Sequence, residues 1–111
     1  MSVPCLQGWQ GWQGWQGWHG RIAHIDLTAR RVETMHLDPE CYTRFLGGKG
    51  LGGYLLRPHI SKAWDDPDMP LLFMTGPLVG TIAPTSGRLH VLSRSPLTGF
   101  LGDSSVAGKL G

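Results

Sequence analysis

The sequence has little cysteine, little charge and no long apolar run. Its two cysteines, Cys5 and Cys41, lie far apart, with no CxxC pattern and no histidine at metal-ligand spacing. This argues against a zinc or iron–sulfur motif and favours two reduced thiols. Charged residues make up 16% of the chain, and 10 Lys and Arg nearly balance 8 Asp and Glu. A charge this even argues against nucleic acid or an anionic membrane as a partner.

The chain also lacks segments that direct a protein to or through a membrane. No stretch approaches the ~18 apolar residues of a membrane span, and the N-terminus has neither the basic start nor the apolar core of a signal peptide. We therefore expect a cytoplasmic protein. Its 111 residues suffice for one small domain. They are too few to hold a large redox cofactor, a metal cluster and a substrate channel together.

Tryptophan, in contrast, is concentrated in a repeat near the N-terminus. The tripeptide Gln-Gly-Trp occurs four times in succession between Gln7 and Trp18. A period of three matches neither a helix nor a strand, and glycine at every third position opposes order. We therefore predict a flexible tail over residues 1–17 and a globular part over residues 18–111, on which Trp18 packs. The alternative is an aromatic ladder that binds a partner or a sugar.

Hydrophobic periodicity predicts short strands and helices after the repeat. Apolar and polar residues alternate from Ala23 to Leu27, which is typical of a half-buried strand, and a second strand follows over residues 32–37. An N-capping Asp38 followed by proline opens a helix that ends at paired glycines. A second short helix must end near Pro58.

The C-terminal half predicts two further strands and one more helix. Residues 71–75 form a short apolar run, and residues 89–94 alternate between apolar and polar side chains. Asp103 and the serines that follow it have the composition of an N-cap cluster, so we expect a helix to begin near Val106. Together these elements predict an α+β fold with a mixed β-sheet and short helices.

Candidate binding residues lie in three short segments. Residues 47–53 contain five glycines and mimic part of a dinucleotide loop, but they follow a helix rather than a strand, so we interpret them as a flexible turn. Residues 85–88 combine two hydroxyls and a guanidinium, which suit a phosphate or another planar anion. Residues 102–105 offer a second anion site at a helix N-terminus, although the Asp103 carboxylate competes for its donors. Two ordinary turns are the alternative, and no catalytic constellation is visible.

Six short motifs occur in order along the chain, at residues 20–28, 45–52, 75–81, 84–88, 95–99 and 102–104. Each is weak alone, but the series covers almost everything after the tryptophan repeat. It resembles the N-terminal domain of the aldehyde:ferredoxin oxidoreductases, which are tungsten, or sometimes molybdenum, enzymes with a bis-pterin cofactor. The resemblance implies a β-rich saddle on which the two pterin halves of the cofactor lie.

The resemblance also implies which residues contact the cofactor. Arg88 matches an arginine that touches the pterin cofactor, and Ser105, Ala107 and Gly108 fall in a segment that supplies further contacts. The backbone carbonyl of Ser105 would bind a magnesium ion that bridges the two pterin phosphates. The family usually has an asparagine followed by paired glycines here, so the role of that asparagine side chain does not carry over.

In the family, later domains carry four cysteines for a [4Fe–4S] cluster, a second pterin-binding segment and the substrate channel. The resemblance therefore implies the cofactor-cradling part of an enzyme that oxidises aldehydes to carboxylic acids and passes electrons to ferredoxin. We expect a truncated domain, inactive alone, with unpaired strand edges and exposed apolar surface, which the remaining domains or a second subunit complete. The alternative is a non-catalytic binding module, or a relic, whose tryptophan-rich tail makes the contacts.

Overall fold

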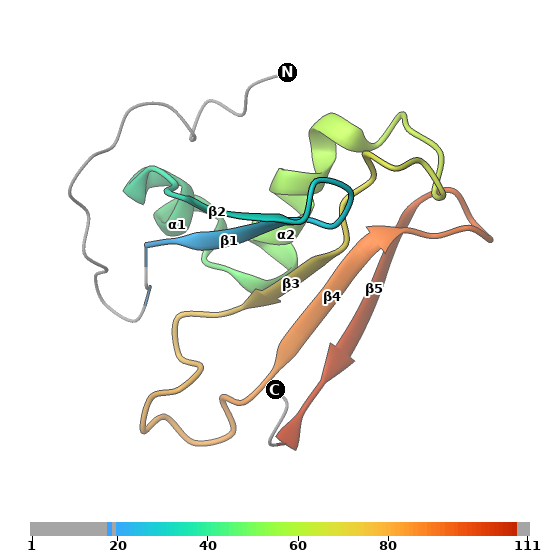
Figure 1. Ribbon diagram of the computed structural model, residues 1–111. Helices are drawn as coiled ribbons and strands as arrows, with labels where there is room; N and C mark the ends of the chain where they lie inside the picture. The colour runs from blue at the N-terminus through green and yellow to red at the C-terminus, as the bar shows by residue number, and fades with distance from the viewer. Residues whose placement is uncertain (1–17, 19, 109–111) are drawn as a thin grey trace.

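Two antiparallel sheets and two short helices make up the part of the chain that the computed structural model describes, Trp18 and residues 20–108. One sheet is a hairpin, and the other has three strands with β4 in the centre (Figure 1). The predicted α+β class is confirmed. The elements are β1 (Ile22–Asp26), β2 (Arg31–Met35), α1 (Pro39–Phe45), α2 (Gly48–Leu56), the 3₁₀ helix η2 (Arg57–His59), β3 (Leu72–Thr75), β4 (Leu89–Arg94) and β5 (Leu101–Val106).

The hairpin of β1 and β2 closes through local hydrogen bonds. Asp26 Oδ1 accepts from the backbone N–H groups of Thr28 and Ala29 at 3.0 and 3.1 Å, which stabilises the turn. Burial differs from the expectation: Ile22 packs against the core, but Ile25 is 59% exposed. The prediction of a half-buried strand is wrong there, because alternation only sorts side chains onto faces and the described elements leave the Ile25 face uncovered.

Helix α1 begins as the sequence predicts and ends in a strained turn. Asp38 Oδ1 accepts from the Glu40 N–H at 2.9 Å. At the other end, Leu46 has φ 64° and ψ −57°, and the Gly47 N–H donates to the Phe45 carbonyl at 2.7 Å. These values define a γ-turn centred on Leu46, a conformation that is rare for leucine.

Helix α2 corrects the interpretation of residues 47–53 as a flexible turn, because residues 48–53 are its first six positions. Glycine is disfavoured in a helix by about 1 kcal/mol relative to alanine. Here close packing outweighs that preference: a Cβ on Gly52 would lie 2.6 Å from Leu92 Cδ1 and 3.2 Å from Met74 Cγ. The glycine thus lets α2 approach the sheet closely enough to bury its leucines, which are Leu51, Leu55 and Leu56.

The core lies between the helices and the inner face of the second sheet. Met74 of β3 and Leu92 of β4 are buried there, and α2 packs on both strands. Trp18 packs on this core as expected, with its ring centroid 5.7 Å from that of Tyr42. The three earlier tryptophans of the repeat lie outside the described residues, so the flexible tail stays a prediction.

Cys41 is fully buried in the core and is disulfide-bonded. The expectation of a reduced thiol is therefore wrong at this residue.

Strand β5 takes the place of the helix expected near Val106. It pairs with β4 from Leu89 opposite Val106 to Arg94 opposite Leu101. The turn at residues 95–99 returns the chain, and the Ser95 N–H donates to the Phe100 carbonyl at 2.8 Å. The anion site expected at a helix N-terminus is therefore wrong, because the same polar side chains line a strand instead.

The expected exposed apolar side chains lie over the second sheet and its loops. They include Phe73, Leu78, Ile82, Leu97 and Phe100. None of the described helices combines the length and apolar character needed to cross a lipid bilayer.

Candidate functional site

Arg88 and Ser105 meet at one end of the second sheet. Arg88 closes the loop of residues 76–88 between β3 and β4, and Ser105 lies near the end of β5, which runs back to that loop (Figure 1). The guanidinium Nη1 of Arg88 donates to Ser105 Oγ at 3.1 Å. The structure therefore brings together two of the four residues that the resemblance singled out.

The loop before Arg88 uses its hydroxyls internally. Thr85 Oγ1 donates to the Pro84 carbonyl at 2.7 Å, and Ser86 Oγ donates to the Ala83 carbonyl at 2.8 Å. Thr85 also has a positive φ of 53°, which is uncommon for a β-branched residue. The two hydroxyls expected to serve an anion thus stabilise the loop in this structure, and the guanidinium is the group that reaches β5.

Two further polar side chains share the sheet face of Arg88 and Ser105. His90 lies directly opposite Ser105, and Asp103 lies directly opposite the buried Leu92. Cross-strand partners and alternate residues along a strand project on the same face. Helix α2 covers the Leu92 part of this face, so the polar residues lie where that cover ends, at the helix N-terminus.

Lys49, in the first turn of α2, reaches this polar group. Its Nζ lies 2.7 Å from Asp103 Oδ2, and His90 Nδ1 lies 3.2 Å from Asp103 Oδ1. The hydrogen bond from Lys49 is the main reason why the pKa of the Asp103 carboxyl falls below its ordinary value, with a smaller contribution from His90. Asp103 is therefore a carboxylate near neutral pH with both oxygens engaged.

Ala107 and Gly108 continue the chain directly after β5. Both are exposed, and Gly108 has a positive φ of 79°, with open space where a Cβ would be. They are thus accessible and placed on the same segment as Ser105.

Sequence reasoning singled out neither Lys49 nor His90 as a site residue. Lys49 stood in a segment interpreted as a turn, and His90 stood in a strand with no metal or catalytic pattern around it. The available signal was the alternation of β4, which puts His90 on the face of Leu92. This alternation identifies His90 as a site residue only once it is known that α2 packs on that face.

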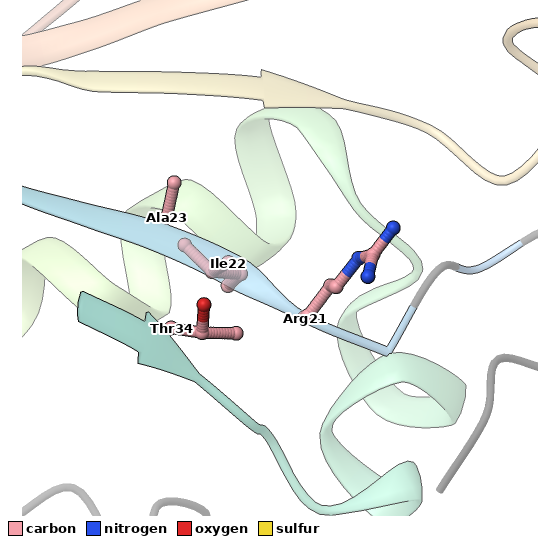
Figure 2. A pocket seen from close by; sticks show the side chains of 4 residues that line it. All are labelled: Arg21, Ile22, Ala23 and Thr34. Carbon is pink, nitrogen blue, oxygen red and sulfur yellow. The ribbon is translucent and has the colours of Figure 1, made fainter. Parts of the chain in front are cut away.

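An open hollow on the hairpin is a separate feature. Arg21, Ile22, Ala23 and Thr34 line it (Figure 2). It contains one charged side chain and none of the polar residues of the second sheet, so it offers no comparable chemistry. In the described part of the chain, no three His, Cys, Asp or Glu side chains gather in a way that could hold a metal ion.

The polar group at the second sheet fits a phosphate. The Arg88 guanidinium and the Ser105 hydroxyl can donate to phosphate oxygens, and guanidinium–phosphate pairs are among the stronger hydrogen bonds in proteins. Asp103 offsets one positive charge and leaves a net cationic site. Side chains of this kind would hold the phosphate groups of a pterin cofactor.

These features define a small α+β module with an exposed cationic site at a sheet end. The family model for the N-terminal domain of aldehyde ferredoxin oxidoreductase matches residues 22–111, and the chain belongs to that family. The tungsten-containing aldehyde ferredoxin oxidoreductases of Pyrococcus furiosus and Pyrococcus abyssi are each 36% identical over 94 residues. An "aliphatic sulfonate oxidoreductase, WOR-like subunit" of Pyrococcus furiosus is 31% identical over 97 residues.

Each of these alignments covers 83% of this chain. The chain spans about 16% of the length of the two aldehyde ferredoxin oxidoreductases and 15% of the sulfonate oxidoreductase subunit. The comparisons thus define the family of the domain, which is a small part of these larger enzymes.

Proposed function

We propose that the chain forms the cofactor-cradling part of a tungstopterin oxidoreductase that oxidises aldehydes to carboxylic acids with ferredoxin as electron acceptor. One observation supports this most directly. The pairing of β4 with β5 brings Arg88 and Ser105 within hydrogen-bond distance on an accessible face, in a chain whose relatives include tungsten-containing enzymes. A structural role alone does not require an exposed arginine at this place.

Arg88 and Ser105 act by holding and orienting. The guanidinium of Arg88 binds a pterin phosphate or ring edge, and the Ser105 hydroxyl, its present partner, becomes a second donor. The backbone carbonyl of Ser105 would be a ligand for a magnesium ion, and the small Ala107 and Gly108 would let the cofactor approach the backbone. The bound tungsten or molybdenum cofactor supplies the redox chemistry, and this chain supplies orientation and hydrogen bonds.

The remaining parts of the enzyme would complete the site. The [4Fe–4S] cluster, the second pterin-binding segment and the contact with ferredoxin belong to other domains or to a second subunit. The exposed apolar side chains of the second sheet and its loops, among them Phe73 and Ile82, suit such a partner, because a partner would bury them.

Metal and pterin analysis of the chain co-expressed with the later domains of the enzyme tests this proposal. The complex should retain pterin and tungsten. Arg88→Ala should reduce pterin retention about tenfold or more, because a charge-assisted contact contributes roughly 1.5–3 kcal/mol. Arg31→Ala, on the exposed hairpin, is the control and should retain pterin fully. Equal retention by Arg88→Ala and the unaltered chain would contradict the proposal, and so would unfolding of Arg88→Ala.

A further inference from the structure

Strand β5 is one of the two outer strands of its sheet, and most of its residues are exposed. Helix α2 packs on β3 and β4, whereas Ser105 belongs to β5. The ion pair of Lys49 with Asp103 crosses β4 and joins the first turn of α2 to β5. It therefore fixes the outer strand, to which Ser105 belongs, against the helix.

Asp103 is held from two directions. Lys49 approaches one carboxylate oxygen from the helix, and His90 approaches the other from β4. The His90 ring lies close to the start of α2, because a Cβ built on Gly48 would lie 3.4 Å from its Cδ2. As a result the Asp103 side chain is only 22% exposed, although it lies on an outer strand.

Ser105 lies two residues after Asp103, on the same face and about 7 Å along the strand. Its cross-strand neighbour is His90, which also contacts Asp103. Fixing Asp103 therefore fixes the end of β5 where Ser105 accepts a hydrogen bond from Arg88. Without the ion pair, pairing with β4 and the hydrogen bond from Arg88 would hold this strand end.

We propose that Lys49 and Asp103 are positioning residues for the Arg88–Ser105 site: their ion pair locks β5 to α2 and so preorganises the donors that bind an anion. Neither residue needs to touch that anion. The proposal rests on the proposed function only for the identity of the anion, a phosphate group.

Two other roles for Lys49 and Asp103, an ordinary surface ion pair or direct binding of the anion by Lys49, predict different effects on anion affinity. An ordinary exposed ion pair contributes little, so its loss would leave the site unchanged. A lysine that binds the anion directly would be released by removing Asp103, and anion affinity would then rise. Positioning predicts the reverse: removing Asp103 weakens anion binding even though it removes a negative charge from a cationic site.

The first experiment needs no ligand. In the full chain, ¹⁵N NMR reports the Nη resonances of Arg88, which are resolved when a hydrogen bond restrains the guanidinium, and the amide shift of Ser105. Lys49→Met and Asp103→Ala should merge the Arg88 resonances and shift the Ser105 amide, and Lys49→Arg should restore both. Lys62→Met, which breaks the Lys62–Asp68 pair at 3.8 Å, is the matched control and should change neither signal. Unchanged Arg88 and Ser105 signals in Lys49→Met overturn the proposal.

The second experiment measures affinity for inorganic pyrophosphate by NMR titration. Lys49→Met and Asp103→Ala should each weaken binding about two- to tenfold, the range expected when one side chain must be ordered on binding. Tighter binding by Asp103→Ala overturns the proposal. If the unaltered chain and Arg88→Ala bind pyrophosphate equally, the proposed function fails instead, and the ligand-free signals still decide whether Lys49 and Asp103 position the site.

Discussion

The two sheets of this protein follow the same local rules but differ in what covers them. In the β1–β2 hairpin, Ile25 and its cross-strand partner Val32 are 59% and 69% exposed. In the second sheet, α2 lies on one face, and Leu92 is fully buried beneath it. The difference shows that alternation decides which side chains share a face, whereas a covering element decides whether that face becomes a core or a site.

The largest effect should come from truncating the covered face. Leu92→Ala removes a fully buried side chain in contact with α2 and should destabilise the protein by about 2–5 kcal/mol. Ile25→Ala on the hairpin should change stability by no more than about 0.5 kcal/mol, as for most surface substitutions. Urea denaturation followed by circular dichroism compares them. A similar loss in both variants would contradict the distinction between the two sheets.

The next effect concerns the close approach of α2 to the sheet. Gly52→Ala would place a Cβ 2.6 Å from Leu92 Cδ1, and overpacking of this kind costs about 1–3 kcal/mol. Gly53→Ala is the matched control, because a Cβ there meets nothing within 4 Å. It should stabilise the helix by about 0.4–1 kcal/mol through the greater helix propensity of alanine. Thermal melts of the two variants should therefore move in opposite directions.

Helix α1 and the strands up to β4 could be predicted because their signals are local. Asp38 and the proline after it mark a helix start by hydrogen-bond chemistry alone. Residues 48–53 and β5 could not be predicted in this way. Gly52 is tolerated in the helix because the sheet packs closely against it, and the polar residues of β5 form a strand because β4 pairs with them.

The residues of the candidate site also fall into two groups, those that sequence motifs predict and those that only tertiary packing brings together. Arg88 and Ser105 could be proposed from sequence motifs, and the structure shows that they meet. Lys49, His90 and Asp103 come together through the packing of α2 on β4 and the register of β4 with β5. Neither the helix packing nor the strand register can be predicted from any one of the segments that carry the three residues. Their association is therefore a result of tertiary structure.

A smaller effect should follow from loosening the contact that precedes the hairpin. Trp18 Nε1 donates to the Leu46 carbonyl at 2.6 Å, at the centre of the strained γ-turn before α2. Trp18→Phe keeps an aromatic ring against Tyr42 but loses this hydrogen bond, and should cost about 0.5–1.5 kcal/mol. Leu46→Gly tests the strain, because glycine accepts a positive φ and should offset part of that loss in the double variant. Urea titrations of the single and double variants measure both effects.

The smallest effect is a pH dependence that the second sheet should show through Asp103. Lys49 and, less strongly, His90 hold the folded-state pKa of this carboxyl below its ordinary value of 3.8. A carboxyl with a lowered folded pKa stabilises the protein fully above its unfolded pKa, and this contribution is lost as the pH falls below about 4 and through the folded pKa. Asp103→Asn removes the titrating group, so the melting temperatures of the variant and the unaltered chain should converge between pH 5 and roughly pH 3. Because the pair lies near the surface, the convergence should be small and should shrink further in 1 M salt, where screening is strong. A constant difference in melting temperature across this range would mean that the pair contributes nothing to the link between α2 and β5.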